Sequence, residues 1–414
     1  MKLTPTARQL YDEIAQLEII DAHTHIPAEA EYLAFGYSGP NLFAGGYVQH
    51  DLESAGMPKE YVERLRDTGD QSVEKWWPHI KPLWENIRHT SYCRALRVTA
   101  RDWFGIDDIN DQTIHELAAK VKADNTLGLY SRVFKKCGTR VAITCVERVA
   151  FPADPQLRGL TMAPQKYLTA KLSAPAIEKW SSGTRIENLE DAEERLLAEL
   201  RHDLCGGAIG IKLLVGEYKA AHQSLAESEF SAAIHSKTPV PVPHVRSFLA
   251  DKVFNVAAEM NIPVAVHTGY WGDYRELDPK FFLDFALRRR DVRFDLFHLG
   301  MPMVQDALMI GKRLPNVTLN LTWCPIISQE QTRRALSEII DLVPLNKITM
   351  FGNDYRVAVQ KAWGHLVLAR ECAAAALGDR VDAGDFDKPE ALRMAKMWFH
   401  DNPYRIYGLE RSGV

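Results

Sequence analysis

The 414-residue sequence predicts an α/β fold, a (β/α)8 barrel in which eight parallel strands form a closed ring inside a layer of helices. Short apolar runs alternate with helix-like stretches, which indicates parallel βαβ units. We count eight such runs, a number that fits a closed barrel better than an open sheet. An open doubly wound sheet would favour a glycine-rich phosphate turn after its first strand. Here the first run ends instead in His23-Thr24-His25-Ile26-Pro27.

The predicted strands follow one another along the whole chain, and no linker or low-complexity tract divides them. They are residues 17–23, 140–146, 167–174, 208–215, 263–267, 293–298, 316–321 and 347–352, of which the third run is the weakest. The clearest helical patterns between them are residues 189–204, 245–260 and 329–342. We therefore expect a single barrel domain that spans residues 1–414.

A long insertion separates the first two predicted strands. Residues 28–138 exceed an ordinary βα connection many times over. They are rich in aromatic side chains set among charged and helix-forming residues, namely Trp76, Trp77, Trp84, Tyr92, Trp103 and Phe104. A loop that leaves the carboxyl end of a barrel strand emerges on the active face. We therefore expect a mainly helical cap over the barrel mouth, with a helical layer on the barrel's side as the alternative.

Composition excludes several classes of protein. Lys and Arg number 50 against 54 Asp and Glu, so the net charge is −4, which argues against a dedicated nucleic-acid binder. No apolar run reaches the roughly 18 residues of a membrane span. The beginning of the chain lacks an apolar signal core, so we expect a cytoplasmic protein. Six cysteines without a Cys-x-x-Cys pair favour reduced thiols over disulfides or a zinc knuckle.

The first strand ends in a His-x-His pair. Because side chains two apart on a strand point the same way, the imidazoles of His23 and His25 converge at one strand end. Paired imidazoles suit zinc or another borderline transition metal. A pair of this kind can also be two surface or hydrogen-bonded core histidines.

Three later residues strengthen the metal prediction. His267 ends the fifth run, His298 ends the sixth, and Asp354 follows the eighth by two residues. The carboxyl ends of barrel strands share one mouth, so these side chains should meet there. Taken singly, His298 could be a satisfied core histidine and Asp354 a helix N-cap.

The ordered set of five residues resembles the amidohydrolase superfamily, in particular its amidohydrolase 2 branch. Asp21-Ala22-His23-Thr24-His25 is similar to that branch's opening strand, and Gly352-Asn353-Asp354 to its eighth strand. The ending, residues 401–408, is similar to its terminal helix. The insertion around Trp77, Trp84 and Phe104-Gly105 also resembles uronate isomerase, a member of the same superfamily.

The resemblance implies that His23, His25, His267 and Asp354 bind one divalent metal ion, with Zn²⁺ as the first candidate, and that His298 orients or polarises the substrate. Lys212 has three interpretations: a carboxylated lysine bridging two ions, with His267 and His298 on the second ion; a substrate contact; or a plain structural lysine. Arg356, two residues beyond Asp354, could meet a substrate carboxylate or form a salt bridge at the rim.

These residues predict a metal-dependent hydrolase that cleaves an amide or lactone bond of a small carboxylated substrate. A bound divalent ion lowers the pKa of water from about 15.7 to about 7, and Asp354 could carry the proton from water to the leaving group. The alternatives are uronate isomerisation or decarboxylation at the same site and, more remotely, a non-catalytic ligand-binding barrel. We expect a small-molecule substrate, no nucleic-acid or membrane partner, and self-association as one option.

Overall fold

The computed structural model describes the whole chain except residues 45–46, 68–71, 147–153, 155, 182–184 and 413–414. Its centre is a sheet of eight strands, in the order β1-β2-β3-β5-β7-β8-β9-β10, and all neighbouring pairs are parallel. The strands are β1 Ile19–Thr24, β2 Thr139–Val146, β3 Leu157–Thr161, β5 Ala208–Leu214, β7 Pro263–His267, β8 Arg293–Phe297, β9 Val317–Asn320 and β10 Ile348–Thr349.

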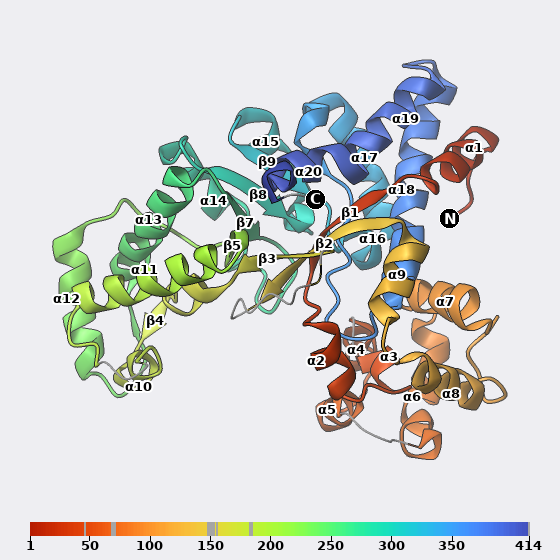
Figure 1. The fold of residues 1–414 in the computed structure, drawn as a ribbon, viewed down its shortest axis with the longest axis horizontal. Coiled ribbons are helices and arrows are strands. Elements are labelled where there is room, and N and C mark those ends of the chain that lie inside the picture. Colours follow the sequence, from red (N-terminus) through yellow and green to blue (C-terminus); the bar gives the residue numbers. More distant parts are fainter. Residues whose placement is uncertain (45–46, 68–71, 147–153, 155, 182–184, 413–414) are drawn as a thin grey trace.

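The two edges of this sheet meet, so the strands form a nearly closed barrel. The amide of Ala22 in β1 donates to the carbonyl of Phe351, just after β10, at 3.0 Å. The amide of Asp354 donates to the carbonyl of His23 at 2.8 Å. The predicted α/β barrel is therefore confirmed (Figure 1).

The position of the third strand was predicted wrongly. Residues 167–174 instead follow a short 3-10 helix and contribute β4 (Lys171–Leu172), which pairs antiparallel with β6 (Val240–Pro241) outside the barrel. The true third strand is β3, whose Arg158 and Gly159 interrupt its apolar pattern. Burial on the two faces of the barrel wall, rather than a continuous apolar run, defines this strand.

Helices cover the outside of the barrel, and the helices predicted at residues 189–204, 245–260 and 329–342 are confirmed with small shifts of their ends. Helix α11 begins at a capping box, in which the side chains of Asn188 and Asp191 bond each other's backbone amides. The helices outside the insertion are α1 Pro5–Ile14, α10 Ala174–Glu178, α11 Leu189–Cys205, α12 Gln223–His235, α13 Pro243–Glu259, α14 Lys280–Arg288, α15 Val304–Arg313, α16 Cys324–Ile327, α17 Gln329–Leu342, α18 Lys361–Ala383, α19 Lys388–Lys396 and α20 Asn402–Ile406. In the described part of the chain, none of the helices is long and apolar enough to traverse a bilayer.

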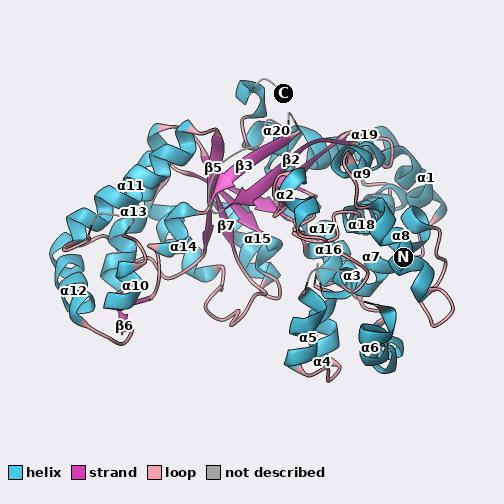
Figure 2. Cartoon of the chain, turned by 60° about the horizontal axis from the view of Figure 1, so that its bottom comes forward, coloured by secondary structure: helices cyan, strands magenta, loops and turns pink. Residues whose placement is uncertain are grey.

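Between β1 and β2 the chain forms the inserted helices α2–α9. They are α2 Glu29–Ala34, α3 Asn41–Ala44, α4 Val48–Ser54, α5 Lys59–Arg66, α6 Val73–Ile87, α7 Ser91–Phe104, α8 Ile114–Asp124 and α9 Leu129–Cys137. Figures 1 and 2 show most of them on one side of the strands, with α10–α13 on the other side. The buried side chains of α3–α8 form one apolar cluster with Trp323 and Tyr355, which follow β9 and β10, whereas those of α2 and α9 pack into the main core of the barrel. That the inserted helices act as a cap remains a prediction.

The end of the chain closes the barrel at the amino-terminal ends of its strands. Ile406, Tyr407 and Leu409 pack against the side chains inside the barrel. The guanidinium of Arg293, at the start of β8, donates to the carbonyl of Ile406 at 3.1 Å. The candidate site residues His23 and Asp354 lie at the opposite end of the barrel, at the carboxyl-terminal ends of the strands.

Candidate metal centre

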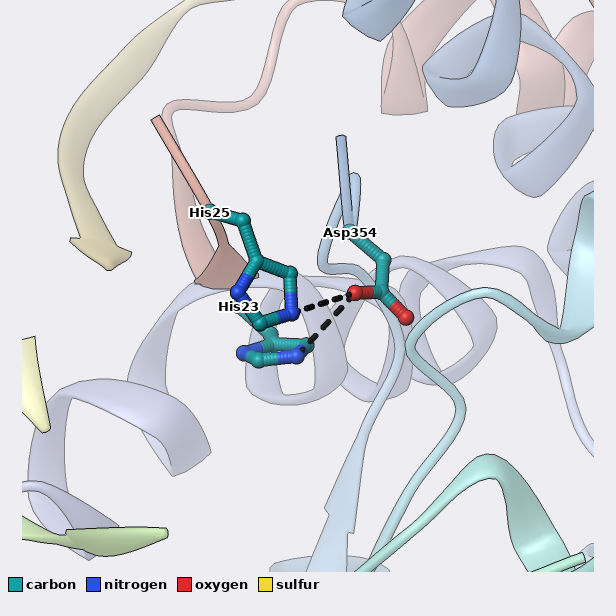
Figure 3. Close-up of side chains that lie close together, drawn as sticks. All are labelled: His23, His25 and Asp354. Atoms are coloured by element: carbon teal, nitrogen blue, oxygen red, sulfur yellow. Dashed lines mark ion pairs between the residues drawn. The ribbon is translucent and has the colours of Figure 1, made fainter. Parts of the chain in front are cut away.

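The end of β1 brings two imidazoles to one carboxylate. Nε2 of His23 lies 3.1 Å and Nε2 of His25 lies 3.2 Å from Oδ1 of Asp354 (Figure 3). The His23 side chain is 1% exposed and that of His25 is 32% exposed, so the cluster is buried on one side and open on the other. The convergence expected from the His-x-His spacing is thus present.

Asp354 reaches this position because the chain after β10 passes very close to β1. A Cβ added to Gly352 would lie 2.2 Å from Oγ1 of Thr322 and 2.7 Å from the amide nitrogen of His23. The backbone of Asp354 has a φ of 58°, in the left-handed region that residues other than Gly, Asn and Asp rarely adopt. Strain of this kind persists where the surroundings hold a residue firmly, and it clusters at functional sites.

A buried carboxylate fixes this passage. Asp21 accepts a hydrogen bond from the amide of Asn353 at 3.0 Å and a second, short one from the Asn353 side chain. Burial raises the pKa of Asp21 to about 7, although the bonds from Asn353 oppose the rise. Asp21 and Asn353 therefore clamp the end of β10 onto β1. Sequence reasoning noted both residues in their motifs but missed the bond between them.

The two remaining histidines contact each other. Nδ1 of His267 lies 3.0 Å from Nε2 of His298, whose Nδ1 lies 2.8 Å from the carbonyl oxygen of Thr322. Nε2 of His298 is 3.9 Å from Oδ2 of Asp354, beyond hydrogen-bonding distance. Nε2 of His267 is buried and has no hydrogen-bond partner.

The donor set fits a divalent transition metal. One ligand atom each from His23, His25 and Asp354 lies within 4.8 Å of the others, so one ion can touch all three. Burial lowers the pKa of His23 to about 3, which keeps its imidazole neutral and its lone pair available. His267 is outside this group of three in the structure, and its Nε2 is a buried nitrogen without a hydrogen-bond partner among the described residues.

Lys212 lies inside the barrel beneath these residues. It is 4% exposed, and its Nζ sits 4.5 Å from the ring centroid of Phe297. Burial lowers the pKa of Lys212, while Cys145 and Asp354 favour its charge. Sγ of Cys145 in turn lies 3.2 Å from Nδ1 of His23, a contact that the spacing of the cysteines did not signal.

Arg356 is exposed and lies close enough to Tyr37, a residue of the insertion, to affect the pKa of its hydroxyl. Burial raises the pKa of Tyr37, and Arg356 opposes the rise. Arg356 therefore lies beside the inserted helices, and among the described residues it forms no salt bridge with a carboxylate. Whether it also meets a substrate stays a prediction.

Aromatic rings cover the cluster from both the barrel and the insertion. Tyr47 precedes α4 and donates its hydroxyl to the carbonyl of Asp354 at 2.8 Å. Its ring lies 4.5 Å from that of Trp323, which is 5.3 Å from the ring of His298. Trp271, in the loop after β7, is 46% exposed and 6.4 Å from the Tyr47 ring. Sequence reasoning missed Tyr47 because no pattern in the insertion sets it apart.

A barrel of parallel strands with imidazoles and a carboxylate at its carboxyl-terminal mouth defines a class of metal-dependent enzymes. The sequence matches the Amidohydrolase family over residues 20–409, so the chain belongs to that family. This confirms the resemblance to the amidohydrolase superfamily drawn from the motifs. No curated protein sequence is similar enough to count as a match.

Solved structures share the fold over almost their whole length. Uronate isomerase from Thermotoga maritima has a TM-score of 0.77 at 15% identity, with 98% of each chain covered. Glucuronate isomerase from Caulobacter crescentus has a TM-score of 0.75 at 15% identity, covering 98% of this chain and 94% of that one. A Lactobacillus casei protein inferred to be a metal-dependent hydrolase has a TM-score of 0.66 at 14% identity, covering 97% and 98%.

Proposed function

We propose that this protein is a metal-dependent hydrolase that cleaves an amide or lactone bond of a small carboxylated substrate. The observation that supports this most is the meeting of His23 and His25 with Oδ1 of Asp354 at the open end of the barrel. Membership of the amidohydrolase family supports the same reaction class. His23, His25, His267 and Asp354 would hold one divalent ion, with Zn²⁺ the first candidate because neutral imidazoles dominate the set.

When bound, such an ion makes water acidic enough to ionise near neutral pH and polarises a carbonyl. Asp354 has two carboxylate oxygens with different surroundings. Oδ1 faces His23 and His25, whereas Oδ2 is free of hydrogen bonds from them. We propose that Oδ2 takes a proton from the attacking water and passes it to the departing amine or alkoxide.

The substrate carboxylate needs a cation near this mouth. Arg356 and Lys212 are the two candidates predicted from the sequence. Arg356 is exposed beside the inserted helices, so its guanidinium is accessible to a ligand from solvent. Lys212 is buried near Cys145 and Asp354, so as an unmodified lysine it would act deeper in the site.

Isomerisation of a uronate is the second candidate. It is favoured by the likeness to two uronate isomerases, which extends through the inserted helices as well as the barrel. The cluster of His23, His25 and Asp354 fits isomerisation as well: Oδ2 of Asp354 would then move a proton between neighbouring carbons of the sugar.

A panel of substrates distinguishes hydrolysis from isomerisation. The metal-loaded protein is incubated with lactones and amides of small carboxylic acids and, in parallel, with uronates. Release of a ring-opened acid or an amine supports hydrolysis, whereas conversion of an aldose to a ketose supports isomerisation. Carbon dioxide release would instead indicate decarboxylation. A chelator should abolish whichever activity is found, and turnover that persists without metal contradicts both candidates.

A further inference from the structure

His267 has a buried nitrogen that nothing in the described structure satisfies. The side chain is 8% exposed, and its Nε2 has no hydrogen-bond partner among the described residues. Buried polar atoms in folded proteins almost always have a partner, so an orphaned one calls for an explanation. A metal ion near His23 and Asp354 would supply the missing partner.

The contacts of the two histidines determine where their protons lie. The Thr322 carbonyl can only accept, so at 2.8 Å Nδ1 of His298 carries a hydrogen and donates it. In a neutral imidazole the other nitrogen, Nε2, is then an acceptor. Nδ1 of His267, at 3.0 Å, must donate to it. His267 is left with a bare lone pair on Nε2, which is the form that binds a metal.

The alternative, in which His298 carries a proton on both nitrogens and donates to His267, is energetically less favourable. A doubly protonated His298 would place a positive charge in a fully buried position, 3.9 Å from its nearest carboxylate oxygen. It would also force a hydrogen onto Nε2 of His267, where no acceptor lies. The observed distances therefore favour the neutral relay from His267 through His298 to Thr322.

The backbone holds His298 for this role. His298 and Leu299 follow β8 with φ values of 68° and 48°, both in the left-handed region. Such conformations are costly and persist only where packing fixes them. The His298 ring is fully buried, and its Nε2 faces His267 rather than the open mouth.

We infer that His298 is a positioning residue that fixes the tautomer and orientation of His267, so that Nε2 of His267 becomes the fourth ligand of the metal. This departs from the sequence-based role of His298 as a residue that polarises the substrate. It rests on the proposed metal site but not on the reaction carried out there. Partners behind a ligating histidine commonly change metal affinity 10–100-fold when they are removed.

Metal affinity tests this without any substrate. The apo protein is titrated with Zn²⁺ in competition with a chromophoric chelator, and with Co²⁺ to record the visible spectrum of the site. His298→Leu removes both the acceptor and the donor, so Zn²⁺ affinity should fall about 10–100-fold and the Co²⁺ spectrum should change. His298→Gln keeps one donor and one acceptor and should retain most of the affinity.

A matched control is Asn402→Leu, because Asn402 is a buried polar residue whose Nδ2 donates to the carbonyls of Leu345 and Ile348, each at 2.8 Å, at the opposite end of β10 from Asp354. It should lose stability but keep its Zn²⁺ affinity within a factor of a few. Wild-type affinity in His298→Leu, with or without activity, overturns the inference. An equal loss of Zn²⁺ affinity in Asn402→Leu also overturns it, because the loss would then follow from general destabilisation.

A second measurement needs no variant that might fail to fold. Nitrogen chemical shifts of ¹⁵N-histidine-labelled, zinc-loaded protein should show His298 and His267 both protonated on Nδ1 only. A proton on Nε2 of His298 overturns the inference. A protein that passes both tests but hydrolyses nothing would refute the proposed reaction and leave the role of His298 standing.

Discussion

At the scale of single residues, Asp354 combines a left-handed backbone with a buried carboxylate beside two imidazoles. Asp354→Asn preserves the shape, and asparagine tolerates a φ of 58° nearly as well as aspartate. We predict an unchanged melting temperature of the metal-free protein and at least about a 100-fold loss of kcat/KM, because the proton carrier is gone. Steady-state kinetics with the substrate that the proposed panels identify measures this loss. Near-normal activity would rule out Asp354 as the proton carrier.

Gly352 is the second residue on which the geometry depends. In Gly352→Ala the new methyl would collide with Thr322 and with the backbone of His23, so β10 must move away from β1. We predict a loss of stability of about 1–3 kcal/mol together with weaker zinc binding. Gly378→Ala is the control, because its methyl would meet Ala7 at 2.8 Å, between α18 and α1. Denaturant melts and zinc titrations should show both losses in the first variant and the stability loss alone in the second.

At the scale of elements, the inserted helices are joined to the barrel through Tyr47. Tyr47→Phe keeps the ring against Trp323 and removes the bond from the hydroxyl to the Asp354 carbonyl. We predict a stability loss of about 0.5–1.5 kcal/mol, the ordinary value of one hydrogen bond. Urea denaturation checks this against Tyr61→Phe, elsewhere in the same insertion. If both variants unfold at the same urea concentration as the wild type, the Tyr47 hydroxyl does not stabilise this junction.

A second contact between the barrel and the inserted helices, made by Lys361, should make the stability of the protein depend on pH. Lys361, at the start of α18, is fully buried, and its Nζ donates to the Leu42 carbonyl of α3 at 3.0 Å. Burial lowers the pKa of Lys361 to about 7, below its unfolded value of about 10.4. Between these values the unfolded chain binds more protons than the folded one, so stability rises with pH.

The comparison with Lys361→Met isolates this contribution. We predict that the free energy of unfolding of the wild type, minus that of Lys361→Met, rises by roughly 2–3 kcal/mol between pH 7 and 9. Chemical denaturation at several pH values measures the difference. Parallel profiles for the two proteins would mean that Lys361 keeps an ordinary pKa in the folded state.

Elements also show how far the sequence alone could lead. The run at residues 263–267, which is β7, was predicted correctly because it is apolar up to its final residue, His267. β3 was missed because Arg158 and Gly159 break its pattern, while residues 167–174 look more strand-like and lie outside the barrel. The pairing of strands, not local composition, makes β3 a strand.

At the scale of the whole molecule, chain segments more than three hundred residues apart meet at one mouth. The sequence predicted the meeting of His23, His25 and Asp354, because barrel strands end together. It could not predict the bond between Asp21 and Asn353, the pairing of His267 with His298, or the cover by Tyr47. Each of these depends on side-chain contacts across the barrel that no periodicity encodes.

A metal that bridges distant segments should stabilise the whole fold. Ligands that bind only the folded state raise its stability by mass action. We predict that chelation lowers the melting temperature and that Zn²⁺ or Co²⁺, but not Mg²⁺ at equal concentration, restores it, because imidazole ligands disfavour Mg²⁺. Scanning calorimetry of the apo and reloaded protein measures this. Equal rescue by Mg²⁺ would contradict a site dominated by histidines.

The metal content of each chain, measured together with the intact mass, tests the central claim most directly. We predict one zinc ion per chain after chelation and reloading, an unmodified Lys212, and loss of that ion in His23→Ala. No tightly bound metal would contradict the site itself. Two ions with a carboxylated Lys212 would contradict the single-ion arrangement of His23, His25, His267 and Asp354.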